Sequence, residues 1–168
     1  MTSISAGLYI RVGMSDWKAS TDKEQLRTSG LGSCIGVVIY QRSGALAVMA
    51  HILLPACPEN QLENTQLRAK FADTSIEDIV HFFHKQNIPS RKLAAKMAGG
   101  AQMFAVSSGR ENKSIGFRNA EAVKEALQLY SVPLLAEDTG GDKGRTITFD
   151  PGSANLYIRK AYGEENAI

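Results

Sequence analysis

The chain has 168 residues, of which 43% are hydrophobic and 21% are charged, and its formal net charge at pH 7 is +2. This length and composition predict one globular domain with a substantial core, spanning residues 1–168. The near balance of charge argues against a nucleic-acid partner and against attraction to an anionic membrane surface. Two cysteines and three histidines lack the paired spacing of zinc ligands, so we expect neither a metal nor a disulfide scaffold.

Residues 1–5 contain no basic region followed by an apolar segment, so we expect no secretory signal. The most apolar stretch, residues 45–57, is short and is interrupted by His51 and Pro55, so it cannot span a bilayer as a helix. We therefore expect a protein of the reducing cytoplasm that does not insert directly into a membrane.

The first part of the chain is predicted to consist of strands and loops. Residues 7–12 have the pattern of a strand, the polar segments 15–24 and 59–66 are typical of loops, and a hairpin is expected from the two apolar runs 35–40 and 45–52. The turn at Arg42-Ser43-Gly44 makes the two runs of this hairpin antiparallel.

A helix is predicted over residues 75–85, where apolar residues recur at helical spacing. The sequence Thr74-Ser75-Ile76-Glu77 has the pattern of a capping box, and Pro89 follows the helix. His81 and His84 lie three positions apart on it, but no third ligand is evident, so a solvated helix face is the preferred interpretation over a metal site.

The second part of the chain alternates strands with a second helix. Asn119 is predicted to cap that helix, which covers residues 120–130. The strands are expected at residues 92–97, 132–136, 145–149 and 155–159, the last two as a hairpin, with a polar loop at residues 137–142. Strands on both sides of two helices predict an α/β (α+β) domain, in which the helices pack on a mixed, mostly antiparallel sheet.

The pairs Gly99-Gly100 and Gly140-Gly141 match neither a P-loop nor a dinucleotide fingerprint, so we expect no cofactor. Glu137 and Asp138 are adjacent carboxylates that would point to opposite faces of an extended chain, which argues against paired acid–base work.

Cys34 and His51 are the candidate reactive residues. Cys34 ends a glycine-rich segment just before the first strand of the predicted hairpin, and His51 lies at the far end of the second strand. Because antiparallel pairing returns the second strand to the start of the first, His51 is brought back towards Cys34. A histidine beside a cysteine generates the thiolate that acts as a nucleophile. The structural interpretation remains open, because free cysteines are often buried and a lone histidine is usually structural.

Six motifs in order resemble the chemoreceptor glutamine deamidase family, CheD, over residues 26–160. They are Thr28-x-Gly30-Leu31-Gly32-Ser33-Cys34, Met49-Ala50-His51-x-Leu53-Leu54-Pro55, Lys70-Phe71-Ala72-Asp73-Thr74, Lys96-Met97-Ala98-Gly99-Gly100-Ala101-x-Met103-Phe104, Ile115-Gly116-x-Arg118-Asn119 and Leu135-Ala136-Glu137-Asp138-Thr139-Gly140-Gly141.

The resemblance implies an amidohydrolase that converts glutamines of methyl-accepting chemotaxis receptors to glutamate, with a catalytic triad of Cys34, His51 and Thr28. It also implies a fold similar to the catalytic domain of the cytotoxic necrotizing factor deamidases. The partners that it implies are the cytoplasmic helices of the receptors and, in some family members, a CheC-type phosphatase.

Two other hypotheses remain open at this point. The chain would be a regulatory binding protein if its main role were to dock the phosphatase. It would be a redox sensor if Cys34 formed a disulfide or a sulfenate, and Thr28 would then have no role. Release of ammonia from a receptor fragment separates the deamidase from both.

Overall fold

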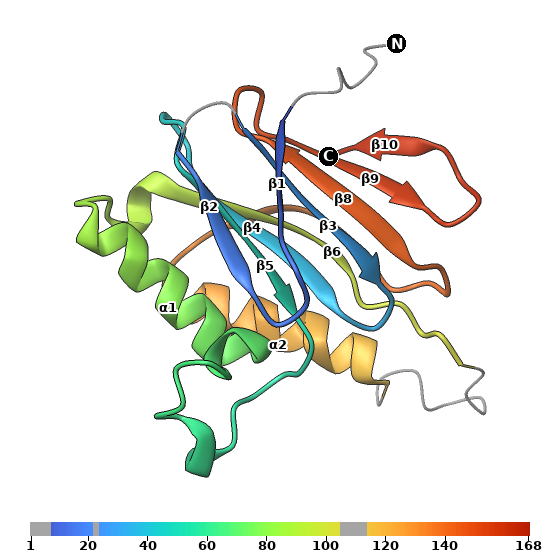
Figure 1. The fold of residues 1–168 in the computed structure, drawn as a ribbon, viewed down its shortest axis with the longest axis horizontal. Coiled ribbons are helices and arrows are strands. Elements are labelled where there is room, and N and C mark those ends of the chain that lie inside the picture. The colour runs from blue at the N-terminus through green and yellow to red at the C-terminus, as the bar shows by residue number, and fades with distance from the viewer. Residues whose placement is uncertain (1–7, 22–23, 105–113) are drawn as a thin grey trace.

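The computed structural model describes residues 8–21, 24–104 and 114–168, and its strands form two five-stranded sheets (Figure 1). In spatial order the first sheet contains β1 (Tyr9–Arg11), β3 (Gln25–Leu31), β8 (Arg145–Asp150), β9 (Asn155–Lys160) and β10 (Glu165–Ala167). The second contains β2 (Trp17–Ser20), β5 (Ala47–Ile52), β4 (Ile35–Gln41), β6 (Leu93–Gly99) and β7 (Leu134–Thr139).

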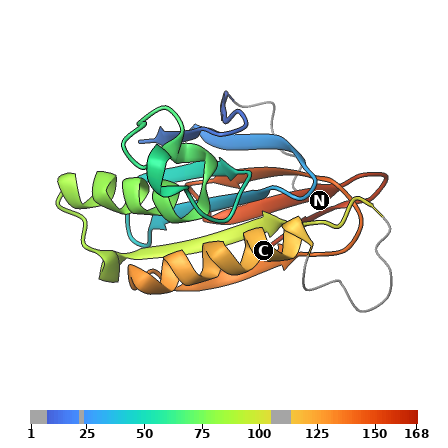
Figure 2. The same cartoon turned by 90° about the horizontal axis from the view of Figure 1, so that it is seen from below.

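Most strand pairs are antiparallel, whereas β1 with β3 and β6 with β7 are parallel. Two helices, α1 (Ala72–Lys85) and α2 (Ile115–Leu129), pack beside each other, and single 3₁₀ turns occur at Glu59–Gln61, Arg68–Lys70 and Ser90–Lys92. Figures 1 and 2 show both helices against the second sheet, with the first sheet on its other side. The predicted α+β class is therefore confirmed, while the likeness to the necrotizing factor domain stays a prediction.

The central strand β4 is buried on both faces, and its successive side chains point alternately into two hydrophobic cores. Ile35, Val37 and Ile39 face α1 and α2, where they contact apolar residues of both helices. Val38 and Tyr40 face the first sheet and join Ile147 and Phe149 of β8. The side chains of β4 that point away from the helices thus lie between the two sheets. The candidate site residues belong to this layer between the sheets.

The predicted hairpin of β4 and β5 is confirmed, with Ile35 opposite Ile52 and Gly36 opposite His51. The strand predicted at residues 92–97 and the hairpin of β8 and β9 are confirmed as well. The strand predicted at residues 132–136 begins at Leu134 and continues to Thr139, into the segment expected to be a loop. The start of the strand predicted at residues 7–12, and residues 1–5, lie outside the described residues.

The prediction of a loop over residues 15–24 is wrong, because β2 pairs with β5 along the edge of the second sheet. Its sequence Trp-Lys-Ala-Ser is short and polar because only one side of an edge strand has to pair. Trp17 lies opposite Ala50 and stacks against Phe82 of α1. This contact is remote in sequence, so the local pattern does not indicate it.

Both predicted helix starts are wrong. Helix α1 begins at Ala72, and Thr74 does not cap it but donates its hydroxyl proton to the carbonyl of Arg68 at 2.6 Å. Helix α2 begins at Ile115 and is capped by Ser114, which accepts from the N–H of Phe117 at 3.2 Å. Gly116 lies in the first turn of α2, where an added Cβ would collide with the backbone of Gly100, so this glycine permits close packing.

None of the helices in the part of the chain that the structure describes is long and apolar enough to cross a membrane.

Candidate active site

Thr28 and His51 meet in the buried layer between the two sheets. Thr28 extends from β3 and His51 from β5, and their Oγ1 and Nδ1 atoms are 2.8 Å apart. The Thr28 hydroxyl also lies 2.8 Å from the carbonyl oxygen of Val12, which can only accept. Since the hydroxyl has one proton and gives it to Val12, it must accept from His51 Nδ1–H. The opposite nitrogen, Nε2, therefore has no proton and is the basic atom.

His51 Nε2 is buried and has no hydrogen-bond partner among the described residues. Cys34 immediately precedes β4 and lies on the same face of the sheet as Gly36, which pairs with His51. Cys34 is thus a diagonal cross-strand neighbour of His51 on one face of the sheet, and no hydrogen bond joins the two in the described residues. Gly36 carries no side chain beside His51, and Ile147 and Leu31 fill the space that a Cβ at Gly36 would enter.

Burial keeps both reactive groups uncharged at neutral pH. Desolvation raises the pKa of the Cys34 thiol above its ordinary 9.0, and a hydrogen bond from the residue's own N–H opposes this shift to a smaller extent. Desolvation lowers the pKa of His51 below its ordinary 6.5. The resting pair is therefore a thiol beside a neutral imidazole, and this arrangement fits a base that removes the proton as the sulfur attacks.

The carbonyls of the turn that carries Cys34 accept three hydrogen bonds. The carbonyl of Gly32 accepts from the N–H of Ala101 at 2.8 Å, and the carbonyl of Cys34 accepts from the N–H of Gly100 at 2.8 Å. The carbonyl of Ser33 accepts from the Asn119 side chain at 3.0 Å. Successive carbonyls of the turn are therefore fixed by the end of β6 and by α2.

The segment before this turn belongs to β3 up to Leu31, so only the last residues of the glycine-rich segment form the turn. A bulge between Thr28 and Leu31, with Gly30 at a φ of +72°, redirects the chain from the strand that carries Thr28 into the turn that carries Cys34.

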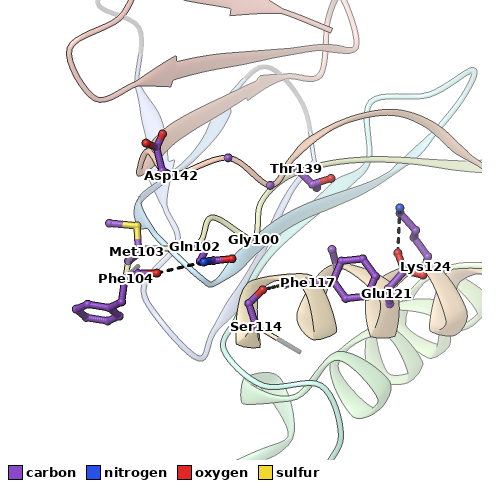
Figure 3. A pocket seen from close by; sticks show the side chains of 13 residues that line it. Gly100, Gln102, Met103, Phe104, Ser114, Phe117, Glu121, Lys124, Thr139 and Asp142 are labelled. Carbon is purple, nitrogen blue, oxygen red and sulfur yellow. Dashed lines mark hydrogen bonds and ion pairs between the residues drawn. The ribbon is translucent and has the colours of Figure 1, made fainter. Parts of the chain in front are cut away.

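A cavity of about 780 Å³ opens beside this turn (Figure 3). Glu121 and Lys124 of α2 line one side, Thr139 and Asp142 line the other, and Met103 and Phe104 stand at one end. A second cavity, of about 190 Å³, shares Met103 and Phe104 with the first and reaches Ser33. The exposed side chains of Met103 and Phe104 thus border both cavities. The smaller cavity reaches Ser33, the neighbour of Cys34, while neither is lined by Cys34 or His51 themselves.

Comparison with known proteins identifies the family. The model of the family "CheD chemotactic sensory transduction" matches residues 53–160. The chain belongs to the CheD family. It is 45% identical to a "Probable chemoreceptor glutamine deamidase CheD" of Syntrophomonas wolfei. The alignment spans 150 residues and covers 89% of this chain and 92% of the relative.

Two further CheD relatives extend the match over nearly the whole chain. A "Chemoreceptor glutamine deamidase CheD" of Halalkalibacterium halodurans is 43% identical, with 95% of this chain and 98% of the relative covered. The protein of that name in Bacillus subtilis is 38% identical, with 99% of each covered. These alignments extend beyond the region that the family model matches, which begins after Thr28, Cys34 and His51.

The structure sets the other candidate groups of this CheD protein apart from the site. Cys57 is buried, with its N–H bonded to the Asp73 carboxylate, and His81 and His84 lie on the exposed face of α1. In residues 8–21, 24–104 and 114–168, no three His, Cys, Asp or Glu side chains form a group that could hold a metal ion.

The adjacent carboxylates Glu137 and Asp138 form ion pairs with different partners. Glu137 forms an ion pair with Lys124 of α2 on one side of β7. Asp138 forms ion pairs with Arg145 and Lys160 on the other side. Their separate partners give both carboxylates structural roles.

Sequence reasoning missed two buried residues that support the site. Arg145 is almost fully buried and donates to the carbonyls of Gly99 and Gly140 and to the Asp138 carboxylate, which ties the glycine-rich segments to the end of β6. Asn119, predicted as a helix cap, reaches the turn that carries Cys34. Both belong to or border the glycine-rich motifs, but their partners lie on other elements, so no local pattern reveals these contacts.

We expect Gly99→Ala to destabilise the protein by about 3 kcal/mol, from backbone strain and overpacking together. Gly99 has a φ of +124°, and an added Cβ would collide with the carbonyl of Cys34. That carbonyl cannot move without shifting Cys34, so deamidase activity should fall further than stability alone explains. Thermal melting and ammonia release measure the two effects.

Gly140→Ala is the matched control for this change. Gly140 also has a positive φ, of +82°, but nothing lies within 4 Å of the added Cβ. Equal losses in the two variants would mean that the contact with Cys34 is unimportant.

The pH dependence of deamidation and of Cys34 alkylation should show that Cys34 and His51 are both uncharged at neutral pH. Because burial lowers the pKa of His51, deamidation should decline only as the pH falls below 6.5, the ordinary value, when the imidazole becomes protonated. Because burial raises the thiol pKa, the rate at which iodoacetamide alkylates Cys34 in a Cys57→Ala background should still rise at pH 9.0. Alkylation that is already maximal at neutral pH would instead reveal a preformed thiolate–imidazolium pair.

Proposed function

We propose that this protein hydrolyses the side-chain amide of particular glutamines on methyl-accepting chemotaxis receptors, through a thioester on Cys34. The observation that carries the proposal is the directed hydrogen bond from His51 to Thr28, which leaves an unprotonated Nε2 on the face of the sheet that also holds Cys34. The printed names of its relatives, chemoreceptor glutamine deamidases, support the same reaction class.

In the first half of the reaction, His51 Nε2 removes the thiol proton while Cys34 Sγ attacks the carboxamide carbon of the glutamine. The carbon–oxygen double bond becomes a single bond, and its oxygen takes the negative charge. When the tetrahedral intermediate collapses, the carbon–nitrogen bond breaks and the imidazolium returns its proton to the departing ammonia. The product of this half is a thioester between Cys34 and the glutamyl side chain.

In the second half, His51 removes a proton from water, and the resulting hydroxide attacks the thioester carbon. Collapse of the second intermediate breaks the carbon–sulfur bond and releases a glutamate side chain. His51 returns the proton to sulfur, so the enzyme leaves the cycle as it entered. One water is consumed and one ammonia is released for each glutamine.

Thr28 orients the imidazole in this scheme. Its hydroxyl accepts from Nδ1–H and is fixed in turn by the Val12 carbonyl, so the ring has one tautomer and one orientation. A hydroxyl has no negative charge with which to stabilise an imidazolium. Thr28 is therefore expected to contribute less than Cys34 or His51.

The depression beside the turn is the proposed receptor-binding surface. A primary carboxamide offers few features for recognition, so selectivity for one glutamine requires contacts with the surrounding receptor helix. Phe104 is 86% exposed and Met103 49%, and both border the cavity that leads to Ser33. Exposed apolar side chains of this kind are typical of protein-binding surfaces. A cytoplasmic location is part of this proposal, because the substrate helices are cytoplasmic.

The same exposed residues favour a second role, the docking of a CheC-type phosphatase. If both partners use this surface, the phosphatase should inhibit deamidation competitively when it is titrated into the assay. Undiminished deamidation with the phosphatase demonstrably bound would refute the shared surface and leave the triad untouched.

The proposed reaction is tested by incubating cytoplasmic receptor fragments with the protein and sequencing the peptides by mass spectrometry. Conversion of amide to acid adds about 1 Da at the modified glutamine, as the hydrolysis in this scheme requires. Heat-denatured protein is the control for spontaneous deamidation. Glutamines that stay unmodified, together with a lack of ammonia release, would leave a regulatory binding protein as the better explanation.

A further inference from the structure

Asn119 joins the turn that carries Cys34 to the strand that carries His51. It is fully buried on α2, and its Nδ2 atom lies 3.0 Å from the carbonyl oxygen of Ser33 and 2.8 Å from that of Leu53. Carbonyl oxygens only accept, so the amide must present its NH₂ group to both, and the orientation of the side chain is determined. One side chain thus spans the residue before Cys34 and the residue just after β5.

The contact with Ser33 also fixes a second group of the same peptide bond. In a planar trans peptide the C=O of one residue and the N–H of the next point in opposite directions. Because Asn119 holds the carbonyl of Ser33, the N–H of Cys34 points away from Asn119. The carbonyl of Gly32 accepts from the N–H of Ala101, so the N–H of Ser33, which belongs to the same peptide as that carbonyl, points away from Ala101.

These two N–H groups are available. Neither the N–H of Ser33 nor that of Cys34 has an acceptor among the residues that the structure describes, other than the Cys34 sulfur itself. The N–H of Cys34 belongs to the same residue as the sulfur, and the N–H of Ser33 belongs to the residue just before it. Two neighbouring free donors beside a nucleophile suit an oxygen that gains negative charge.

We propose that Asn119 is a positioning residue, which holds the Ser33–Cys34 peptide so that the N–H groups of Cys34 and Ser33 stabilise the oxyanion formed from the glutamine carboxamide. This inference rests on the proposed function, because it requires Cys34 to be the nucleophile. Asn119 touches neither substrate nor sulfur, and it acts through the backbone of the turn.

The unpaired half of the Asn119 side chain supports a role beyond stability. Its Oδ1 atom is buried and has no hydrogen-bond partner among the described residues. An unsatisfied buried acceptor costs stability, and an amide that served only to stabilise the fold would not carry this cost. What Asn119 provides is a double donor at a fixed point between two carbonyls.

The test compares two reactions of Cys34 in Asn119→Ala. Deamidation passes through an oxyanion, whereas alkylation by iodoacetamide displaces iodide from a saturated carbon and forms none. We expect kcat for deamidation of a receptor fragment to fall by about 10- to 100-fold, less than the full loss of an oxyanion donor. KM and the pH profile of alkylation should stay close to those of the parent, all measured below the melting temperature.

Thr74→Val is the matched control. The Thr74 hydroxyl is also buried and donates to a carbonyl, that of Arg68, at 2.6 Å, but on α1 and away from the turn. This variant should lose stability and keep its kcat. If Asn119→Ala does not fold, Asn119→Ser gives the same comparison, because its shorter side chain cannot span both carbonyls.

Two results would overturn the inference alone. They are an unchanged kcat in a folded Asn119 variant, and equal losses in deamidation and alkylation, which would indicate general loosening of the site. Full deamidation by Cys34→Ala would instead refute the proposed function, and the role of Asn119 with it. The two failures are therefore distinguishable in one set of variants.

Discussion

Cys34→Ala is expected to abolish ammonia release from receptor fragments while the protein melts at nearly the parent temperature. Without the sulfur no thioester forms, and loss of a nucleophile that acts with its base lowers kcat by a factor on the order of 10⁴–10⁶. The side chain is only partly buried at the edge of the core between the sheets, so removal of one sulfur disturbs little packing. A coupled ammonia assay and thermal melting measure both expectations.

Cys57→Ala provides the matched control, since Cys57 is the other free cysteine. It is buried beside Asp73 and makes no contact with the site, so this variant should keep its activity even if it loses some stability. Substantial activity in folded Cys34→Ala would remove Cys34 from the nucleophile's role. Activity lost equally in both cysteine variants would point to a requirement for thiols in folding and not in catalysis.

The parts of the site that the sequence predicts are those fixed by local pairing. His51 lies on β5, and Cys34 immediately precedes β4, its antiparallel neighbour, so alternation and register alone bring the two residues to one face. The triad role of Thr28 came from family resemblance, because β3 belongs to the other sheet and its side chain meets His51 across the interior. Packing between sheets leaves no periodic signature in the sequence.

The difference between local and long-range contacts also explains why the predictions for β2 and for the start of α2 are wrong. The edge strand β2 pairs with β5 from a distant part of the chain, and its polar composition resembles a loop. Asn119 is predicted to cap a helix, but it lies within α2, where its side chain reaches the carbonyl of Ser33. A residue that makes a tertiary contact near the site can therefore lie inside a helix although its local pattern is that of a helix end.

His51→Ala is expected to lower kcat almost as far as Cys34→Ala, and the Cys34→Ala/His51→Ala double variant should be little worse than either alone. The reason is that the two residues act as a unit: without the base the buried thiol keeps its proton, and without the sulfur the base has nothing to activate. Ammonia release from the same receptor fragment, with melting curves for each variant, gives the comparison.

Thr28→Val tests how much the third residue contributes to kcat compared with Cys34 and His51. It keeps the shape of the side chain but removes the hydroxyl, which leaves His51 Nδ1–H and the Val12 carbonyl without their partner. Two buried groups then lose a hydrogen bond, so we expect stability to fall by about 1–3 kcal/mol and kcat to fall less than in His51→Ala. Additive losses in the folded double variant of Cys34 and His51 would show that the two residues act independently. In that case the hydrogen bond between Thr28 and His51 would serve to join the two sheets and would not orient a catalytic base.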